Sequence, residues 1–548
     1  MSVSELDRAR AAYQPRLPGV LSGGEFHLEE DPTDAAHTFA DEIRREFPNT
    51  VEKPLLRLVP GAGGLSVEPL VVGVVFSGGQ APGGHNVVAG LLDALTRANP
   101  ASRLIGFLDG PIGVIKNRYI ELTPERVEPY LNTGGFDMLG SGRDKIEKPE
   151  DLEACRKNLT ALGAHGLVII GGDDSNTNAA VLAEYFKANS VPVCVIGVPK
   201  TIDGDMKNDY IEASFGFDTA SKVFAELVGS ICRDSMSARK YWHFIRLMGR
   251  AASHITLEVA LQTRPNLAII SEEAEARGWK LMDVVDLIAD VVTRRAKAGK
   301  SYGVVLIPEG LLEFLADVKA MIAELGSILG EHEDYLKSLT SHEDRRQFLT
   351  EKFTAESAEV YNSLPDGIQE VLLLRDKHGN IPLSQVETEK LLIDLVSDRI
   401  REMKAEGRFP GSFSPLAHFF GYEGRCVQPS NFDADYCYTL GYTAAQLIRG
   451  DVTGYTVSAR NLTAPASEWV VGGVPVTSML TVEMRKGKPK PVIRKTLVSV
   501  DGKPFRAFAA ERDSWVEEDR FAYPGPIQYF GPSEVCDRLT KTLMLEHS

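Results

Sequence analysis

The sequence predicts an α/β fold of two doubly wound, Rossmann-like parallel-sheet domains with a helical insertion. Between residues 70 and 311, short apolar runs typical of buried parallel strands alternate with amphipathic helical stretches. Several of these runs end in glycine-rich or acidic loops, which is where open α/β sheets place their ligands. The chain has 548 residues, too many for one hydrophobic core, and its strands are too numerous for a single such sheet.

Shifts in composition give the expected domain boundaries. The first residues are polar and rich in Pro and Gly, so we expect an arm that lies on the body. A charged, helix-forming stretch interrupts the second α/β region and is expected to be a helical insertion. The expected parts are an N-terminal arm (1–69), a first α/β domain (70–235), a second α/β domain (236–311 plus 409–455), the helical insertion (312–408) and a C-terminal extension (456–548).

The composition excludes several classes of protein. A content of 43% hydrophobic and 25% charged residues is that of an ordinary soluble globular protein. The net charge of −16 argues against a nucleic acid as the main partner, so an anionic substrate must meet a local basic pocket. The six cysteines form no CxxC pair, which favours reduced thiols in a cytoplasmic protein over disulfides or a zinc site. We expect neither a signal peptide nor a membrane span, because no long apolar run occurs.

The loop Pro199–Asp205 is the strongest candidate for a catalytic site. It follows the apolar run Val191–Val198 and carries Lys200, Asp203 and Asp205. One carboxylate there can take a proton from a hydroxyl while the lysine offsets charge on phosphoryl oxygens, as phosphoryl transfer requires. A solvated turn is the alternative, because Asp and Gly are ordinary turn residues. Similar loops upstream favour the catalytic interpretation.

A glycine-rich loop, Ser77–Asn86, connects the apolar run Leu70–Phe76 to the helical stretch Val87–Arg97. Its glycines allow backbone N–H groups to approach a phosphate, and the helix N-terminus adds partial positive charge. The loop matches neither a Walker A motif nor GxGxxG, so a purely structural turn remains an alternative. A further loop, Thr133–Arg143, ends in a cation.

An acidic loop, Gly171–Asn178, follows the apolar run Gly166–Ile170 and precedes a helix predicted over Ala179–Lys187. Asp173 near its start suits Mg²⁺, which takes one or two carboxylates together with phosphate oxygens and water. Asp at a helix start also serves simply as a cap, which is the alternative for Asp174.

The second α/β region carries polar loops of the same kind. Lys240–Leu247 is expected to be a strand, and it leads into Met248–His254 ahead of another helix. Gly303–Ile307 is a further expected strand and enters Pro308–Gly310. After the insertion, the chain returns to this region with Phe419–Arg425.

Five motifs together resemble the phosphofructokinase family in their order and approximate spacing. Within that family the chain is similar to the long form of the pyrophosphate-dependent 6-phosphofructokinases. Asp174 stands where ATP-using members carry glycine, Lys200 precedes Thr201, and Gln80 departs from an acidic residue common in ATP-using members. The motifs are Gly78-Gly79, Gly171-Gly172-Asp173, Thr201-Ile202-Asp203-Gly204-Asp205, Met248-Gly249-Arg250 and Glu309.

This resemblance implies catalytic and donor-binding roles. Asp203 would be the base that deprotonates the 1-hydroxyl of fructose 6-phosphate, with Asp205 supporting it. Lys200 and Arg143 would neutralise the transferring phosphoryl group, and Asp174 would exclude ATP. Asp173 would bind Mg²⁺, and Gly78 would contact pyrophosphate through its backbone.

The resemblance also implies a sugar-phosphate site completed by a second subunit, so that the enzyme would be at least a dimer, and we expect a homodimer. Lys240 and Tyr241 would reach the site of the neighbouring subunit. The remaining contacts would come from Thr201, Ile202, Asp203, Met248, Gly249, Arg250, Glu309, Tyr422, Glu423, Gly424 and Arg425.

The expected activity is reversible transfer of phosphate from pyrophosphate to fructose 6-phosphate, with Mg²⁺ as cofactor. An ATP-dependent enzyme of the same fold is one alternative. A non-catalytic subunit that binds sugar phosphate is another, although the intact Asp173, Asp203 and Asp205 argue against it.

Overall fold

The structure is a computed structural model of the 548-residue chain. Among the residues that it describes, no helix is long and apolar enough to cross a membrane. The described residues are 4–33, 40–374, 381, 383–485 and 488–548.

The chain forms two compact units, each assembled from separate stretches of sequence. Residues 422–455, which were expected in the second α/β domain, belong to the first unit, and so does most of the C-terminal extension. The first unit comprises Met1–Ser221, Tyr422–Thr496 and Ile527–His547, and the second comprises Lys222–Gly421, Leu497–Pro526 and Ser548.

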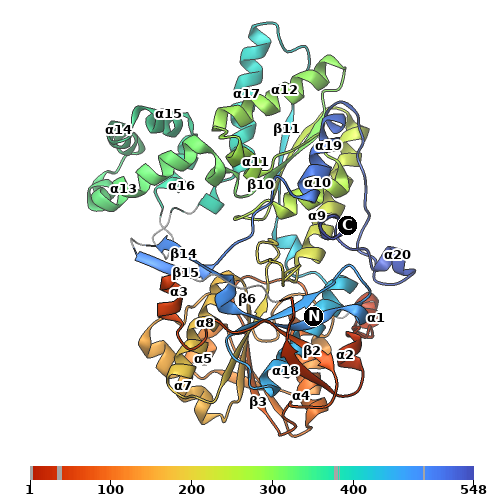
Figure 1. Ribbon diagram of the computed structural model, residues 1–548. Helices are drawn as coiled ribbons and strands as arrows, with labels where there is room; N and C mark the ends of the chain where they lie inside the picture. The colour runs from red at the N-terminus through yellow and green to blue at the C-terminus, as the bar shows by residue number, and fades with distance from the viewer. Residues whose placement is uncertain (1–3, 34–39, 375–380, 382, 486–487) are drawn as a thin grey trace. The chain divides into compact units, whose positions relative to one another are not determined.

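The first unit is built on a nine-stranded sheet whose centre is parallel and whose edges are antiparallel (Figure 1). The two strands at its middle, β7 and β6, are buried at every position, as expected for strands covered on both faces. In spatial order the strands are β1 (Phe26–Glu30), β2 (Leu56–Pro60), β13 (Val470–Pro475), β12 (Tyr455–Arg460), β7 (Cys194–Pro199), β6 (Gly166–Gly171), β3 (Val71–Phe76), β4 (Arg103–Phe107) and β5 (Tyr119–Leu122).

Helices cover both faces of this sheet. On one face, Leu159 of α7 and Leu182 of α8 share a core with Val75, Leu167 and Val195 of the strands. Helix α18 packs against α4 and contacts β7 and β12. The helices of this unit are α1 (Glu5–Ala11), α2 (Gly19–Ser22), α3 (Asp41–Glu46), α4 (Gly84–Ala98), α5 (Pro111–Ile115), α6 (Pro124–Val127), α7 (Pro149–Ala161), α8 (Asp173–Ala188), α18 (Asn431–Arg449), α20 (Ser533–Cys536) and α21 (Lys541–Glu546).

Two glycines allow α4 and α18 to approach closely. A Cβ at Gly90 of α4 would overlap the carbonyl oxygen of Tyr438, and a Cβ at Gly441 of α18 would overlap that of Val87. Any larger residue at either position would therefore push the two helices apart. This packing fixes α18 on the body of the first unit. The helix begins at Asn431, shortly after the predicted sugar-phosphate residues 422–425.

The N-terminal residues are part of the sheet, where an arm lying on the body was expected. Strand β1 pairs with β2, and β2 pairs through Arg57 and Leu56 with β13 of the C-terminal extension. The pairing partner lies more than 400 residues away in the chain, so local sequence patterns could not reveal it.

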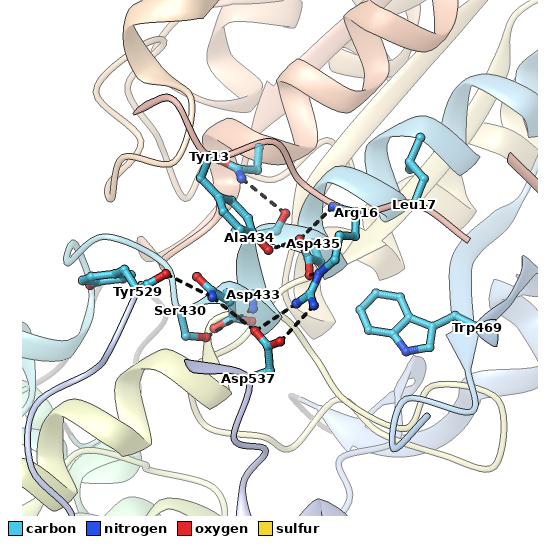
Figure 2. Close-up of polar contacts among 12 residues, drawn as sticks. Tyr13, Arg16, Leu17, Ser430, Asp433, Ala434, Asp435, Trp469, Tyr529 and Asp537 are labelled. Atoms are coloured by element: carbon cyan, nitrogen blue, oxygen red, sulfur yellow. Dashed lines mark hydrogen bonds and ion pairs between the residues drawn. The ribbon is translucent and has the colours of Figure 1, made fainter. Parts of the chain in front are cut away.

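An ion-pair cluster ties both ends of the chain to α18 (Figure 2). Arg16 Nε donates to Asp435 Oδ2 at 2.7 Å, and Arg16 Nη1 donates to Asp537 Oδ2 at 2.9 Å. The hydroxyl of Tyr13 donates to Asp435 Oδ1 at 2.8 Å. Burial raises the pKa of the Asp435 carboxyl, and the Arg16 guanidinium opposes that rise. The N-terminal and C-terminal residues therefore share one charged anchor on α18.

The second unit contains a four-stranded parallel sheet with the order β11-β8-β10-β9. The helical insertion shares its hydrophobic core, because Leu325, Leu349 and Val396 of the insertion cluster with Phe244 and Val305 of the strands. The strands are β8 (Trp242–Leu247), β9 (Leu267–Ala268), β10 (Gly303–Pro308) and β11 (Pro415–Phe420). The helices are α9 (Phe217–Ala238), which begins in the first unit, α10 (His254–Thr263), α11 (Ser271–Ala276), α12 (Leu281–Lys297), α13 (Ala316–Ser338), α14 (His342–Lys352), α15 (Ala355–Ser363), α16 (Asp366–Leu372), α17 (Thr388–Ala405) and α19 (Lys503–Glu517).

Candidate active site

Three loops meet at the carboxyl ends of the neighbouring parallel strands β3, β6 and β7 in the first unit. Backbone hydrogen bonds join them: Ser77 N donates to Ile170 O at 2.8 Å, and Lys200 N donates to Gly171 O at 3.0 Å. The phosphate-loop, metal and base motifs of the sequence are thereby brought to one edge of the sheet, which is where open α/β sheets bind ligands.

The glycines after β3 leave room for cationic side chains. A Cβ at Gly79 would overlap Arg425 Nη2 and would lie 3.8 Å from Arg143 Nη2. Gly78 has a positive φ of 88°, and a Cβ there would lie 3.5 Å from Lys200 Nζ. Three cations from separate segments therefore gather around two residues that lack side chains.

The backbone of Gly78 is already engaged within the protein. Its N–H donates to Gly142 O at 2.8 Å, and its carbonyl accepts from Ser141 Oγ at 2.6 Å. The family resemblance implies that the Gly78 backbone contacts pyrophosphate. In this structure the Gly78 N–H is already hydrogen-bonded to Gly142 O and is not available for that contact. What the glycine provides is space beside Lys200.

Lys200 is buried among charges of both signs. Burial lowers its pKa to about 8, with Arg425 acting in the same direction and the carboxylates of Asp203, Asp173 and Asp205 opposing. The group is therefore still protonated at neutral pH, but at a desolvation cost. A bound anion would offset that cost.

The base loop turns sharply at Gly204, whose φ is 74°. Asp203 N donates to Thr201 Oγ1 at 3.0 Å, and Ser214 Oγ donates to Thr201 O at 3.2 Å. Asp205 is buried, and its backbone oxygen accepts from Thr496 N at 2.8 Å. Hydrogen bonds on both sides of Gly204 therefore hold the loop that carries the carboxylates of Asp203 and Asp205.

Asp173 and Asp174 lie in the first turn of α8, which starts at Asp173 instead of at the expected Ala179. Acidic residues are favourable there, because the helix N-terminus carries partial positive charge. Each aspartate also pairs with a lysine: Lys495 Nζ lies 3.4 Å from Asp173 Oδ2, and Lys145 Nζ lies 3.3 Å from Asp174 Oδ1.

The donor set suits a metal that arrives together with a phosphate ligand. Within the described residues, no cluster of three or more His, Cys, Asp or Glu side chains could form a dedicated metal cage. Mg²⁺ requires only one or two carboxylates when phosphate oxygens and water complete its shell. Asp173 can supply such a ligand at the edge of the cation cluster.

The cation cluster has one further property of an anion site. Arg425 Nε is buried and has no hydrogen-bond partner among the described residues. The guanidinium lies 5.3 Å from the ring centre of Tyr422 and beside Arg143 at Gly79. An anion bound at this point would satisfy the buried donor and offset the repulsion between the neighbouring guanidinium groups.

In the second unit, the loops after β8 and β10 meet. Gly249 N donates to the buried carboxylate of Glu309 at 3.0 Å, and Glu309 N donates to Leu247 O at 3.0 Å. Gly249 has a φ of 136°, which a side chain would not tolerate. A Cβ at Gly310 would overlap Arg250 O. Met248, Gly249, Arg250 and Glu309 therefore form one local cluster.

Two further sugar-phosphate candidates of the second unit lie away from that cluster. Lys240 and Tyr241 precede β8, whereas Met248 follows it, so a six-residue strand of about 20 Å lies between them. Lys240 Nζ lies 4.8 Å from the ring centre of Tyr241. Residues 422–425 belong to the first unit, where Tyr422–Gly424 forms a 3₁₀ helix.

A family model described as phosphofructokinase matches residues 71–359, more than half of the chain. The chain belongs to the phosphofructokinase family. Along its whole length it is 53% identical to pyrophosphate–fructose 6-phosphate 1-phosphotransferase of Porphyromonas gingivalis, with 100% of this chain and 99% of the relative covered. The enzyme of the same name from Treponema pallidum is 48% identical, with 100% and 97% covered.

Solved structures support the same fold. The crystal structure of a pyrophosphate-dependent phosphofructokinase from Marinobacter aquaeolei matches with a TM-score of 0.53. It shares 15% sequence identity and covers 82% of this chain and 93% of its own. The α/β fold class and the family resemblance predicted from the motifs are both confirmed.

Sequence reasoning missed two lysines of this phosphofructokinase: Lys145 and Lys495, the partners of Asp174 and Asp173. For Lys495 a signal was present, because six of the eleven residues 485–495 are basic in an otherwise acidic chain. Nothing in that pattern indicated that the segment reaches the first turn of α8.

Proposed function

We propose that this chain catalyses the reversible transfer of phosphate from pyrophosphate to the 1-hydroxyl of fructose 6-phosphate. The products are fructose 1,6-bisphosphate and phosphate. The full-length relatives that share about half of its residues carry the corresponding name. The observation that carries the proposal is the cation cluster of Arg143, Lys200 and Arg425 around Gly78 and Gly79, next to the acidic start of α8.

Within this proposal, Asp203 accepts the proton of the sugar hydroxyl as that oxygen attacks the phosphorus. Asp205, buried beside it, supports the charge and position of the base. Lys200, Arg143 and Arg425 offset the charge that spreads over the phosphoryl oxygens during transfer. Asp173 would hold Mg²⁺, which when bound supplies further charge neutralisation on the diphosphate.

Donor choice follows from the charges near Asp174. A carboxylate at this position disfavours a donor that brings further negative charge and bulk, such as the nucleoside end of ATP. Lys145 holds the carboxylate, and Lys200 supplies attraction for the smaller donor. Pyrophosphate is therefore favoured over ATP.

The acceptor contacts proposed in the second unit are Met248, Gly249, Arg250 and Glu309. Those proposed in the first unit are Thr201, Ile202 and residues 422–425. Lys240 and Tyr241 lie at the opposite end of β8 from Met248, which supports their use in the site of a neighbouring subunit. We propose that the active form is a homodimer and that it works in the cytoplasm.

One assay tests the proposal. Purified protein is incubated with fructose 6-phosphate and Mg²⁺, and fructose 1,6-bisphosphate is measured with pyrophosphate or ATP in parallel. Turnover with pyrophosphate, and release of one phosphate per bisphosphate formed, is the expected result. Turnover with ATP alone would overturn the donor assignment, and turnover with neither would indicate a binding subunit.

A further inference from the structure

The backbone around Lys495 links the two loops that carry the proposed metal ligand and base. On one side of the lysine, Ile493 N donates to Thr177 Oγ1 of α8 at 3.3 Å. On the other side, Thr496 N donates to Asp205 O at 2.8 Å, and the Thr496 hydroxyl donates to Lys207 O. A segment of the C-terminal extension is therefore fixed to both catalytic loops.

The path of this segment determines where Lys495 can reach. It follows the hairpin of β14 (Leu480–Arg485) and β15 (Lys488–Ile493), and Arg494 N donates to Met479 O at 3.0 Å. With its neighbours held in this way, Lys495 brings its ammonium to within 3.4 Å of Asp173 Oδ2. Its side chain is 41% exposed and that of Asp173 is 32% exposed, so both remain open to an incoming ligand.

We propose that Lys495 is a further pyrophosphate-binding residue, which contacts the diphosphate directly beside Asp173. This assignment rests on the proposed function. A partly exposed Lys–Asp pair contributes little stability by itself, so the pair alone gives no strong reason for a lysine at this point. A lysine ammonium is a compact point charge that suits phosphate oxygens.

The charges around Asp173 explain why the ammonium would act on the donor. A divalent cation held by Asp173 would compete with the Lys495 ammonium for the same carboxylate. A diphosphate bound beside Asp173 would then be an anion within reach of Lys495, whose flanking backbone is hydrogen-bonded to both loops. Lys495 adds a fourth positive charge to those of Arg143, Lys200 and Arg425, from the side of α8.

The alternative is a purely structural lysine that closes the segment onto α8. The two roles predict different binding behaviour. A donor-binding lysine strengthens the binding of diphosphate, whereas a structural one only competes with the metal for Asp173. Removal of the side chain would then leave diphosphate binding unchanged or slightly tighter.

The test is calorimetric titration of methylenediphosphonate, a non-hydrolysable diphosphate, into the full-length protein with Mg²⁺. Lys495→Met is expected to raise the Kd about tenfold, as loss of one charge-assisted contact would, and Lys495→Arg to recover part of the loss. Lys490→Met is the matched control, because Lys490 lies in β15 and pairs with Glu147 at 2.8 Å. In steady state, KM for pyrophosphate should rise in Lys495→Met while KM for fructose 6-phosphate stays within twofold.

Methylenediphosphonate binding to Lys495→Met as tight as to the wild type would overturn the assignment. Equal weakening by Lys490→Met would also overturn it, because the effect would then be one of general charge or of hairpin folding. If the wild type turns over pyrophosphate and Lys495→Met behaves like it, the assignment of Lys495 is wrong while the proposed function stands. A wild type that binds no methylenediphosphonate and turns over only ATP removes the proposed function itself and this assignment with it.

Discussion

The loops of the first unit and those of the second unit handle charge in opposite ways. In the first unit, Lys200 is buried among charges of both signs, and the buried Nε of Arg425 has no hydrogen-bond partner among the described residues. In the second unit, the Glu309 carboxylate accepts a hydrogen bond from Gly249 N and the loop is satisfied by itself. The first site therefore keeps a buried donor that an anion can satisfy, whereas in the second the Gly249 N–H already has its acceptor. Substitutions should act on ligand charge in the first and on loop geometry in the second.

The largest expected effect concerns the base in the first unit. Asp203→Asn should lower kcat by at least about 10²-fold with little change in either KM, because it removes proton transfer and keeps the shape of the side chain. Asp209→Asn, at an exposed position of the same segment, is the matched control. An Asp203→Asn enzyme that keeps more than about a tenth of the wild-type kcat would remove Asp203 from this role.

Gly79→Ala tests the cation cluster without removing a charge. The added Cβ would overlap the terminal Nη2 of the Arg425 side chain, so the guanidinium must move while the backbone stays in place. We expect KM for pyrophosphate to rise about tenfold, the equivalent of one lost charge-assisted hydrogen bond. The free energy of unfolding should change by less than about 1 kcal/mol. An unchanged KM would show that the position of Arg425 beside Gly79 is unimportant for donor binding.

Substitutions of Glu309 test whether loop geometry determines ligand binding in the second unit. Glu309→Ala leaves Gly249 N without its acceptor, and we expect KM for fructose 6-phosphate to rise about tenfold while KM for pyrophosphate is unchanged. Glu309→Gln keeps an acceptor oxygen and should behave more like the wild type. If the Gln variant is as impaired as the Ala variant, the carboxylate charge matters more than the loop geometry, and the contrast between the two units disappears.

The smallest expected effect is a pH dependence of donor use. Lys200 has a pKa of about 8, so kcat/KM for pyrophosphate should fall above pH 8 as the ammonium is lost. Lys200→Arg keeps its charge and should lack this decline. The measurement is the ratio of the two enzymes' kcat/KM for pyrophosphate as a function of pH.

Because the usual pKa of a lysine is 10.5, the unfolded chain binds more protons than the folded protein between pH 8 and 10.5. The contribution of Lys200 to the free energy of unfolding therefore rises with pH across that window. A ratio of wild-type to Lys200→Arg activity that stays constant with pH would contradict the lowered pKa of Lys200.

The sequence predicted those features that depend on one short segment of the chain. The apolar runs predicted the central strands, and the loops after them placed Gly78, Asp173 and Lys200 at the carboxyl edge of one sheet, as the structure has them. Strand, turn and helix signals lie within about ten residues of each other in such units, so one chain segment contains them all. The matching motifs were sufficient to identify the family.

What could not be predicted depends on contacts between distant segments. Lys495 reaches Asp173 across more than 300 residues, and β2 pairs with a strand more than 400 residues away. The early start of α8 was missed because Gly172 and the two aspartates are typical of a loop, although the helix dipole makes acidic residues favourable at this position. The hydrogen bond from Gly78 N to Gly142 O likewise depends on two loops that meet only in the fold.

The central claim is that charge at the ends of β3, β6 and β7 selects pyrophosphate, and donor preference tests it most directly. The measurement is the ratio of kcat/KM for pyrophosphate to that for ATP in the wild type, Asp174→Gly, Lys200→Met and the double variant. We predict a ratio far above one in the wild type, a lower ratio in Asp174→Gly, and efficient ATP use only when both residues are changed. A wild type that prefers ATP, or an Asp174→Gly variant with an unmoved ratio, would contradict the account.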